Sequence, residues 1–458
     1  MKTQWLLFAL IVVLAKNGFA QEYYPAAQYT EASYSDLEKR LDALETSFIN
    51  SEEPAADKGW EDVDIITKPT QKWTGRIHFD YWGFPKESAL PNFLEEDDAD
   101  VGPRDVLGFR RLRLGLQGDV SETMHYKIEM DFAAPDNFAF KDAYIGWNEL
   151  PLLHTVLLGN QKRPYGLDML NSSRYTVFME RSLYIDALNP DARRFGLQSY
   201  GLSENQAWNW RYGVMLLDNL QAVGHQRTDN YQSEVAGRLA NTIWYDELSG
   251  GRGYAHWAIS GSAAFPGDGD DDIFQTRPEA RTDDKWFDTG DLSANSYQLI
   301  GLESVINIGA FQIGGEYQAT FAQRASGAGN DLSFGGGYAY MSYWLTGEHT
   351  PWERKSGTMG RTKPFENFFI VRDCNGCRQH GWGAWQVAAR YSHADFTDED
   401  IFGGVGDTFT FGMNWWWSPN SRMQFNYING SISERVATGA PSTDGWYNVY
   451  GLRFMVDF

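Results

Sequence analysis

Basic residues recur at alternate positions in the first third of the chain, a spacing that places them on one face of a strand. Arg111 and Arg113 alternate with leucines, and Lys127 lies in a similar segment that also carries Glu129 and Asp131. A guanidinium presents a planar fork of donors matched to phosphate or carboxylate oxygens, whereas an ammonium acts as a point charge. These cations could bind anions from solution or pair with the nearby carboxylates, and the sequence leaves both interpretations open.

The two cysteines, Cys374 and Cys377, form an isolated CxxC motif. Such a pair could be redox-active or supply half of a zinc site, but no second CxxC or histidine pair completes four ligands. In an exported chain a local disulfide is the ordinary outcome. We therefore expect Cys374 and Cys377 to be bonded to each other.

Acidic residues cluster in three candidate loops, at 95–98, 268–272 and 395–400. Solvated loops are the simplest interpretation of these runs. Asp268, Asp270, Asp272 and Glu279 also match positions 1, 3, 5 and 12 of an EF-hand loop, but position 6 is Ile273 where the turn requires glycine. We expect no built metal site and no cofactor, and divalent-cation binding by the acidic loops stays open.

Composition favours one large β structure. Aromatic residues make up 15% of the 458 residues, there are 46 glycines, and mean hydropathy is negative. After the N-terminal region no apolar stretch reaches the length of a membrane-spanning helix, which excludes a helical membrane protein. A transmembrane barrel escapes this test because its strands alternate apolar residues toward lipid with polar residues toward water.

An alternation of period two begins at Trp73 and recurs to the C-terminus. The face opposite the apolar residues carries Arg, Lys, Asp and Glu in strand after strand, which suits a wet lumen better than the second sheet of a soluble sandwich. We predict an all-β fold, a transmembrane antiparallel β-barrel of about sixteen strands preceded by a short periplasmic coiled-coil-like helix. The predicted strands are 72–82, 108–117, 123–132, 138–147, 153–162, 192–202, 208–218, 231–245, 252–265, 297–308, 311–321, 335–347, 382–393, 408–417, 422–430 and 445–458.

Four segments make up the predicted organisation. Residues 1–20 have a basic start, an apolar core and a small-residue cleavage site, which is typical of a signal peptide. Residues 21–50 carry a two-heptad apolar seam, which is too short for an isolated coiled coil but could zip within an oligomer. Residues 51–71 form an acidic linker, and residues 72–458 form the barrel.

With the N-terminus in the periplasm, connections should alternate between short periplasmic turns and long external loops. The long external loops are expected at 83–107, 163–191, 266–296 and 431–444. The exception is 348–381, which is long yet periplasmic by this count. It either folds back into the pore or contains a missed strand.

The last predicted strand alternates large apolar residues with small or polar ones, and the chain stops on Phe458. This pattern resembles the signal recognised by the outer-membrane insertion machinery. We therefore expect that machinery and outer-membrane lipid as partners, and the outer membrane of a Gram-negative-type bacterium as the location.

Several short runs resemble the phosphate-selective porin O/P family, in the order in which that family has them. The likeness extends from about Trp73 to Phe458. The runs are GFRRLRL at 108–114, MDFA at 130–133, KDAYI at 141–145, NQKRPYGL at 160–167, FMERS at 178–182, YWLTGE at 343–348, AWQVAARYS at 384–392 and GMNWW at 412–416.

The resemblance implies a homotrimer of sixteen-stranded barrels in which inward loops narrow each pore and basic residues line it. The segment from Arg163 to Asp191 is the expected inward loop. Alternation places Arg111 and Arg113 in the lumen, and Arg110 on the opposite face or at a bulge. The candidate pore-lining, anion-binding residues are Arg111, Arg113, Lys127, Lys141, Lys162, Arg163, Arg174, Arg181, Arg193 and Arg194.

The net charge of −22 argues against nucleic acid as a partner and is an awkward background for an anion channel, although the local lumen potential matters more than the sum. No recognisable nucleophile motif surrounds the eight histidines, so we expect no catalytic residues and no enzyme. We expect an outer-membrane porin for passive diffusion of small solutes, including anions such as phosphate. The alternative is a structural or adhesion barrel that tethers envelope layers.

Overall fold

The computed structural model describes residues 69–134, 138–188, 192–221, 224, 231–267, 273–372 and 378–458. The predicted signal peptide, the helical segment 21–50 and most of the linker 51–71 lie outside these residues. So do Cys374 and Cys377 with their predicted disulfide, and three of the four residues of the EF-hand-like pattern. Within the described ranges, no helix has the length and apolar character needed to cross a membrane.

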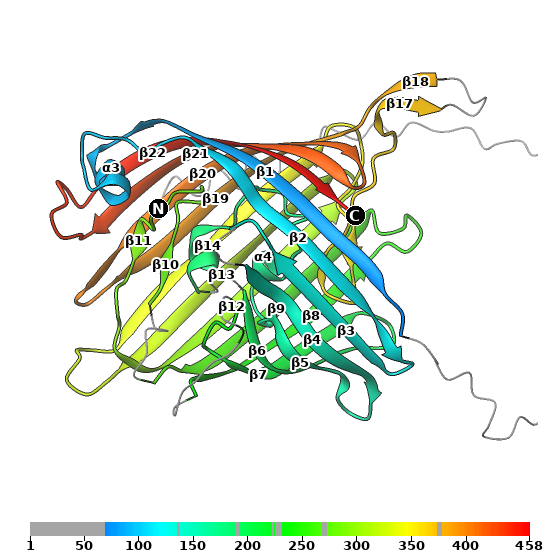
Figure 1. The fold of residues 1–458 in the computed structure, drawn as a ribbon, viewed down its shortest axis with the longest axis horizontal. Coiled ribbons are helices and arrows are strands. Elements are labelled where there is room, and N and C mark those ends of the chain that lie inside the picture. The colour runs from blue at the N-terminus through cyan, green and yellow to red at the C-terminus, as the bar shows by residue number, and fades with distance from the viewer. Residues whose placement is uncertain are drawn as a thin grey trace, which may run out of the picture. The chain divides into compact units, whose positions relative to one another are not determined.

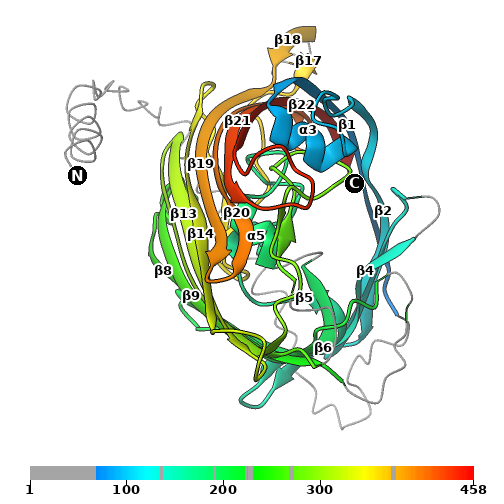
Figure 2. The same cartoon turned by 90° about the vertical axis from the view of Figure 1, so that its left-hand side faces the viewer.

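Sixteen antiparallel strands close into a barrel, in which each strand pairs with its neighbours in the chain and β1 pairs with β22 (Figures 1 and 2). Each of the sixteen predicted spans overlaps one barrel strand, so the predicted fold class is confirmed. The barrel strands are β1 (Lys72–Glu87), β2 (Val106–Ser121), β3 (Met124–Asp131), β4 (Ala139–Leu150), β5 (His154–Lys162), β6 (Arg193–Leu202), β7 (Trp208–Leu216), β8 (Ser233–Tyr245), β9 (Gly253–Phe265), β12 (Ala294–Ile308), β13 (Phe311–Arg324), β14 (Leu332–Trp344), β19 (Ala384–Asp398), β20 (Ile401–Ser418), β21 (Ser421–Arg435) and β22 (Gly445–Asp457).

Alternating side chains give the barrel two unlike surfaces. In β12, Ile300 and Leu302 point outward and are about half exposed, whereas Glu303 and Asn307 are buried inside. Apolar residues face outward because lipid replaces water around a membrane barrel, and polar residues face the lumen. The alternation of apolar and polar residues in the sequence arises because successive residues face lipid and lumen in turn.

Shorter elements lie in the connections between the barrel strands. They are α3 (Ala89–Glu96), α4 (Leu167–Leu170), α5 (Leu183–Leu188), β10 (Gln275–Thr276), β11 (Phe287–Asp288), β15 (Trp352–Glu353), β16 (Thr358–Met359), β17 (Phe368–Arg372) and β18 (Arg378–Trp382). In the described part of the chain the three helices are short, and the six short strands pair only among themselves as three hairpins.

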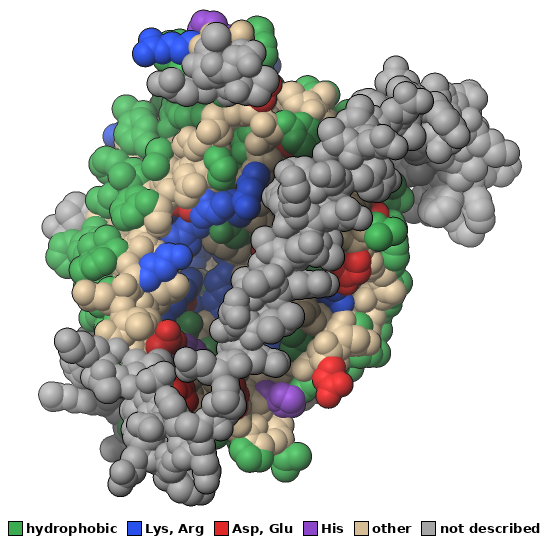
Figure 3. All heavy atoms as spheres, turned by 90° about the vertical axis from the view of Figure 1, so that its right-hand side faces the viewer, with side chains coloured by type: hydrophobic (Ala, Val, Ile, Leu, Met, Phe, Trp, Pro, Cys, Tyr) green, Lys and Arg blue, Asp and Glu red, His purple; other side chains and the backbone are tan. Residues whose placement is uncertain are grey.

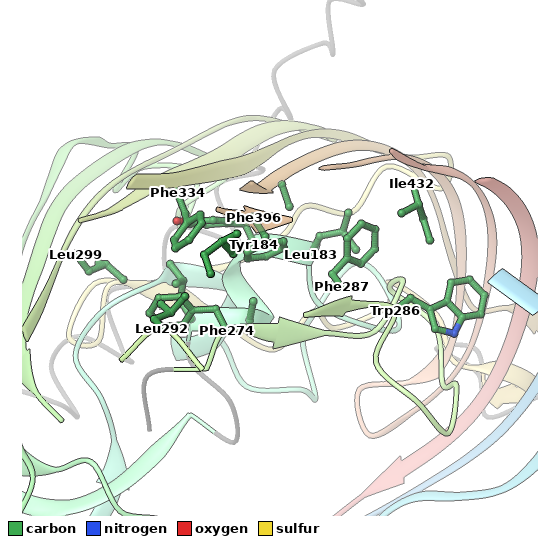
Figure 4. Packing of buried hydrophobic residues seen from close by; sticks show 14 of the residues in the cluster. Leu183, Tyr184, Phe274, Trp286, Phe287, Leu292, Leu299, Phe334, Phe396 and Ile432 are labelled. Carbon is green, nitrogen blue, oxygen red and sulfur yellow. The ribbon is translucent and has the colours of Figure 1, made fainter. Parts of the chain in front are cut away.

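Two external loops fold into the barrel and bury an apolar cluster there (Figure 4). Leu183 and Tyr184 come from α5, and Trp286 and Phe287 come from the connection between β9 and β12. They pack against wall residues that include Phe396, whose ring stacks on that of Tyr184 at 5.3 Å between centroids. Burial of these side chains against the wall holds the two loops inside the lumen.

The long periplasmic connection between β14 and β19 divides into two hairpins. The β15–β16 hairpin enters the lumen, where Trp352 stacks on Tyr254 at 5.3 Å and its indole N–H donates to Thr242. The β17–β18 hairpin instead lies outside the ring of barrel strands (Figures 1 and 2). Of the two alternatives considered for 348–381, folding back into the pore is correct for the β15–β16 hairpin. No barrel strand was missed in its described part, because β17 and β18 pair only with each other.

Candidate pore constriction

A β-bulge in β2 brings two consecutive arginines into the lumen. His78 pairs with Arg111 and Phe79 pairs with Phe109, so Arg110 is the extra residue of the bulge. An extra residue breaks the alternation of side chains locally. Arg110 consequently points inward beside Arg111 and donates two hydrogen bonds of 2.8 Å to Glu180 on the inward loop. Of the two placements expected for Arg110, the bulge is the correct one.

The loop between β5 and β6 crosses the lumen and binds the opposite wall through its backbone. The amide N–H groups of Leu167 and Asp168, at the start of α4, donate to Glu316 of β13 at 2.7 and 2.5 Å. The carbonyl of Val177 accepts from Asn414 of β20 at 2.9 Å and from Gln424 of β21 at 3.3 Å. The inward fold expected for 163–191 is confirmed for the part of that segment that the structure describes.

The wall that receives this loop is lined mainly by amides and hydroxyls. We call the inward faces of β12, β13, β14, β19, β20 and β21 the amide wall. A side-chain amide both donates and accepts, so it can satisfy the irregular backbone of a loop. Its buried members include Asn307, Gln312, Gln318, Thr320, Ser342, Gln386, Thr408, Thr410, Asn414 and Gln424.

The other wall, formed by the inward faces of β1 to β6, carries most of the charge, and we call it the charged wall. A cavity of about 600 Å³ lies between it and the inward loops. Figure 3 shows basic side chains gathered in a hollow of the barrel. Thirteen described basic residues line the cavity, Arg76, Arg110, Arg111, Arg113, Lys127, Lys141, Lys162, Arg174, Arg181, Arg193, Arg277, Arg281 and Lys285, against six acidic ones, Asp131, Asp142, Glu180, Asp186, Glu279 and Asp283.

Carboxylates neutralise part of the charged wall. Glu129 accepts from Arg76 at 2.6 Å and from Arg113 at 3.1 Å, and Arg113 also binds Asp131 at 2.7 Å. Asp142 pairs in the same way with two of the predicted residues, Lys127 and Arg193. For these cations the interpretation as internal ion pairs is correct, and few of their donors are left for a passing anion.

Three predicted cations of the cavity lack a carboxylate partner. Among the described residues, no Asp or Glu oxygen lies within 4.0 Å of the charged groups of Arg111, Lys162 or Arg181. The ammonium of Lys162 donates to three carbonyls at the end of α4, at 2.7, 2.7 and 2.9 Å. Arg181 donates to the carbonyl of Asp168 at 3.1 Å, and Arg111 lies 3.4 Å from a ring nitrogen of His78. These groups keep positive charge facing the cavity.

The remaining predicted residues are placed less uniformly. Lys141 donates to Gln221 at 2.9 Å, and Arg174 pairs with Asp457 at 3.0 Å, and both line the cavity. Arg163 and Arg194 do not line it, but border a separate pocket of about 20 Å³, and Arg163 lies 3.4 Å from Glu234. The structure therefore brings eight of the ten predicted cations together.

The sequence interpretation missed four basic residues of the cavity and left the side of the wall open for a fifth, Arg110. Arg76 lies in β1, whereas Arg277, Arg281 and Lys285 come from the connection between β9 and β12. Glu279 anchors that connection, because its carboxylate binds Arg390 at 2.5 Å and Thr410 at 3.0 Å. Glu279 thus serves an internal ion pair, and no metal-binding group of acids, histidines or cysteines occurs among the described residues.

Glu180 lies at a junction between the inward loop and the barrel seam. It binds Arg110 of β2 and, at 2.6 Å, Arg453 of β22, which in turn donates to Asp80 of β1 at 2.6 and 2.7 Å. Burial alone would raise the pKa of Glu180, but Arg110 and Arg453 hold the pKa of this loop carboxyl well below its usual value. The junction is therefore charged at neutral pH.

A closed barrel of sixteen antiparallel strands with lipid-facing apolar residues and a polar, loop-narrowed lumen defines an outer-membrane porin. The family model for phosphate-selective porin O and P matches residues 72–458, and the chain belongs to this family. Porins of this kind are typically not enzymes, and the chain resides in the outer membrane.

Two curated relatives and one solved structure illustrate the likeness. An uncharacterized protein of Caulobacter vibrioides is 27% identical over 93% of this chain and 88% of its own length. Porin O of Pseudomonas aeruginosa is 24% identical over 82% of this chain and 85% of its own length. The trimer form of OmpT, an outer membrane protein of Vibrio cholerae, superposes with a TM-score of 0.50 at 12% identity, covering 85% of this chain and 99% of that chain.

Proposed function

We propose that this porin passes small anions, phosphate among them, in preference to cations. The observation that carries the proposal is the excess of basic over acidic residues around the cavity of about 600 Å³. Among the described residues, Arg111, Lys162 and Arg181 contribute charge that no carboxylate pairs with at salt-bridge distance. Fixed charge in a narrow, loop-lined passage raises the local concentration of the opposite ion.

The ion pairs of the charged wall suit conduction rather than tight binding. An anion that met thirteen free cations would be held, whereas selective passage needs sites weak enough to release it. Pairing of Arg76, Arg113 and Arg193 with carboxylates moderates the field without removing the positive balance. The expected result is preference for anions with short residence.

The net charge of −22 does not oppose this proposal, because it is a sum over the whole chain and a permeating ion meets the local field of the lining. Glu95 of α3 accepts from the backbone N–H groups of Asp283 and Asp284 and from the indole of Trp286. Those contacts hold the loop that carries Arg277 and Arg281. An acidic residue at the external mouth thus supports the basic lining below it.

We also propose that the chain assembles as a homotrimer. Family membership and the likeness to the trimer form of OmpT support this assembly. Size measurement of the detergent-solubilised protein, before and after heating, tests it. A species that sediments as one barrel at every concentration would contradict it.

Planar-bilayer recording of the purified porin tests anion passage. We expect unitary steps, an anion-selective reversal potential in a salt gradient, and a chloride current that phosphate reduces. Arg181→Gln should weaken both the selectivity and the reduction by phosphate. Arg104→Gln, at an exposed external arginine paired with Glu96, is the matched control and should change little.

Two outcomes would overturn the proposal in different ways. Steps without anion preference would leave a porin with a general diffusion pore. Absence of steps from correctly folded protein would instead favour a barrel that tethers envelope layers.

A further inference from the structure

The β17–β18 hairpin lies at the periplasmic end of the barrel, where it has no place in the pore. The short turns 122–123, 203–207 and 309–310 define this end, because porin turns are short on the periplasmic side. Phe368 pairs with Trp382 and Ile370 pairs with His380 across the hairpin. Figures 1 and 2 both show the hairpin outside the ring of strands.

Contacts with outward-facing tryptophans hold the hairpin against the outside of the wall. The ring of Phe368 meets that of Trp415 of β20 at 4.5 Å between centroids. The carbonyl of Trp382 accepts from the indole N–H of Trp415 at 2.8 Å and of Trp385 at 3.2 Å. The alternation in β19 and β20 places both indoles on the outer surface, on the side opposite to inward Gln386 and Asn414.

The hairpin leaves large apolar side chains uncovered. Trp382 is 74% exposed, Phe369 56% and Ile370 50%. A two-stranded hairpin is marginal in water on its own, and a run of exposed apolar residues in water is unfavourable. Such a composition is expected of a segment that meets an apolar phase.

The uncovered side chains continue a surface that faces lipid. Trp385 stacks on Trp415 at 4.8 Å, Trp415 contacts Trp417 at 5.7 Å, and Trp417 contacts Phe454 at 6.0 Å. This row of outward aromatic rings is the kind of belt that marks a membrane interface. The hairpin extends the belt by one more set of rings.

Exposed polar groups accompany these rings. Lys363, Arg378 and Glu366 are all exposed in or beside the hairpin. By sequence, residues 363–382 carry three cations, Lys363, Arg372 and Arg378, against two carboxylates, Glu366 and Asp373. Basic side chains next to an apolar segment favour contact with phospholipid phosphates.

We propose that the β17–β18 hairpin is a membrane foot that rests in the periplasmic leaflet of the outer membrane and contacts phospholipid there. Phe369, Ile370 and Trp382 enter the boundary between acyl chains and headgroups, and Lys363 and Arg378 face the phosphates. The foot widens the contact between barrel and bilayer at one side, next to strands β19 and β20.

Photocrosslinking in vesicles of phosphatidylethanolamine and phosphatidylglycerol tests the foot. The photoreactive analogue p-benzoylphenylalanine replaces Phe369 in one variant and Trp382 in another, and adducts are identified by mass spectrometry. Phe409, in the middle of the lipid-facing surface of β20, is the positive control. Leu248, fully exposed in the periplasmic turn between β8 and β9, is the matched negative control.

We expect lipid adducts at both hairpin positions with yields near that of Phe409, and none above background at Leu248. Yields as low as at Leu248 would overturn the proposal, because the hairpin would then lie in water. Adducts that join two copies of the chain would overturn it as well, since the occupant would be a neighbouring protomer.

A second variant guards against misplacement of the bulky analogue. Phe369→Ser combined with Trp382→Ser should lower the thermal unfolding midpoint of the porin in vesicles more than in detergent, with unitary conductance unchanged. Leu248→Ser should lower neither. Equal effects of the double variant in vesicles and detergent would contradict a contact with the bilayer.

Discussion

The charged wall and the amide wall face each other across one lumen, and the inward loops contact them by different means, through backbone groups on the amide wall and through charged side chains such as Arg110 on the charged wall. Amides and hydroxyls on β12–β14 and β19–β21 bond to loop backbone, whereas the charged wall keeps a cavity beside it. Covering an ion with a loop requires removing its water, which costs several kcal/mol unless the ion finds a partner. An amide loses less on burial than an ion and can both donate to and accept from loop backbone, so the lining chemistry favours loop docking on the amide wall.

Exceptions on the amide wall follow the same rule. Arg390 of β19 meets the carboxylate of Glu279 from an inward loop, and Glu316 of β13 receives two loop N–H groups. Each of these charges is matched by the loop that covers it. The two walls therefore differ in how far the loops supply hydrogen-bond or ion-pair partners for the wall side chains. Each of the following changes alters that supply.

The largest effect should come from breaking the amide wall. Asn414→Leu combined with Gln424→Leu removes the donors to the carbonyls of Thr176 and Val177. A buried carbonyl left without a donor costs about 1–3 kcal/mol, so the loop should loosen. We expect larger, noisier unitary conductance and weaker anion preference in planar bilayers.

An Asn→Leu substitution on the outer face of β21, the strand that carries Gln424, provides the control for that experiment. Asn429→Leu removes only a contact with Asn448 outside the barrel and should leave conductance unchanged. If the double variant conducts as quietly as wild type, amide bonding is not what seats the loop.

A charge reversal on the charged wall should have the next largest effect. Arg111→Glu changes the local charge by two units, and each unit at roughly 5 Å in water is worth about 0.8 kcal/mol. Anion occupancy should fall about fifteenfold, and the reversal potential in a salt gradient should move toward cations. Arg104→Glu at the exposed mouth should shift the reversal potential far less. An equal shift would show that the position of Arg111 beside the cavity does not matter for selectivity.

Substitutions that keep the charge should separate unpaired from paired cations. Arg111→Lys removes the planar fork and should weaken the reduction of current by phosphate about threefold, the value of roughly one hydrogen bond. Arg113→Lys should change it less, because Glu129 and Asp131 already occupy the donors of Arg113. Equal losses in the phosphate titration would contradict this division.

The smallest effect concerns pH. The pKa of Glu180 is held well below its usual value. The stabilisation from its ion pairs is therefore fully present at any pH above the usual carboxyl pKa, and it is lost only as the pH falls through the depressed pKa. Between about pH 7 and about pH 5 this junction should therefore not alter the unfolding midpoint. Glu180→Gln should lower the midpoint across the whole range, and a wild-type midpoint that falls toward it near pH 5 would refute the assignment.

Local patterning was sufficient to predict the strands, and less so the loops. Period-two alternation depends only on neighbouring residues, which is why all sixteen spans were found. The inward fold of the connection between β9 and β12 depends on distant partners such as Arg390 and Thr410. Its aromatic residues, Phe274, Trp286 and Phe287, were the available signal, and the acidic run beside them pointed to a solvated loop instead.

The lumen-facing cations on strands were predicted better than the ion pairs with carboxylates that partly neutralise them. Alternation placed Arg111, Arg113 and Lys127 inside, but no local rule says that Glu129 reaches both Arg76 and Arg113 across three strands. Likewise, a bulge at Arg110 cannot be distinguished from an outward residue until the register with β1 is known. The missing information is the register between strands.

Arg453 joins Asp80 of the first barrel strand to Glu180 of the inward loop, although it belongs to the last strand. These bonds can form only when the two ends of the sheet have met. The loop carboxylate is thus tied to the seam itself, so the part of the lining around Glu180 is complete only in a closed barrel.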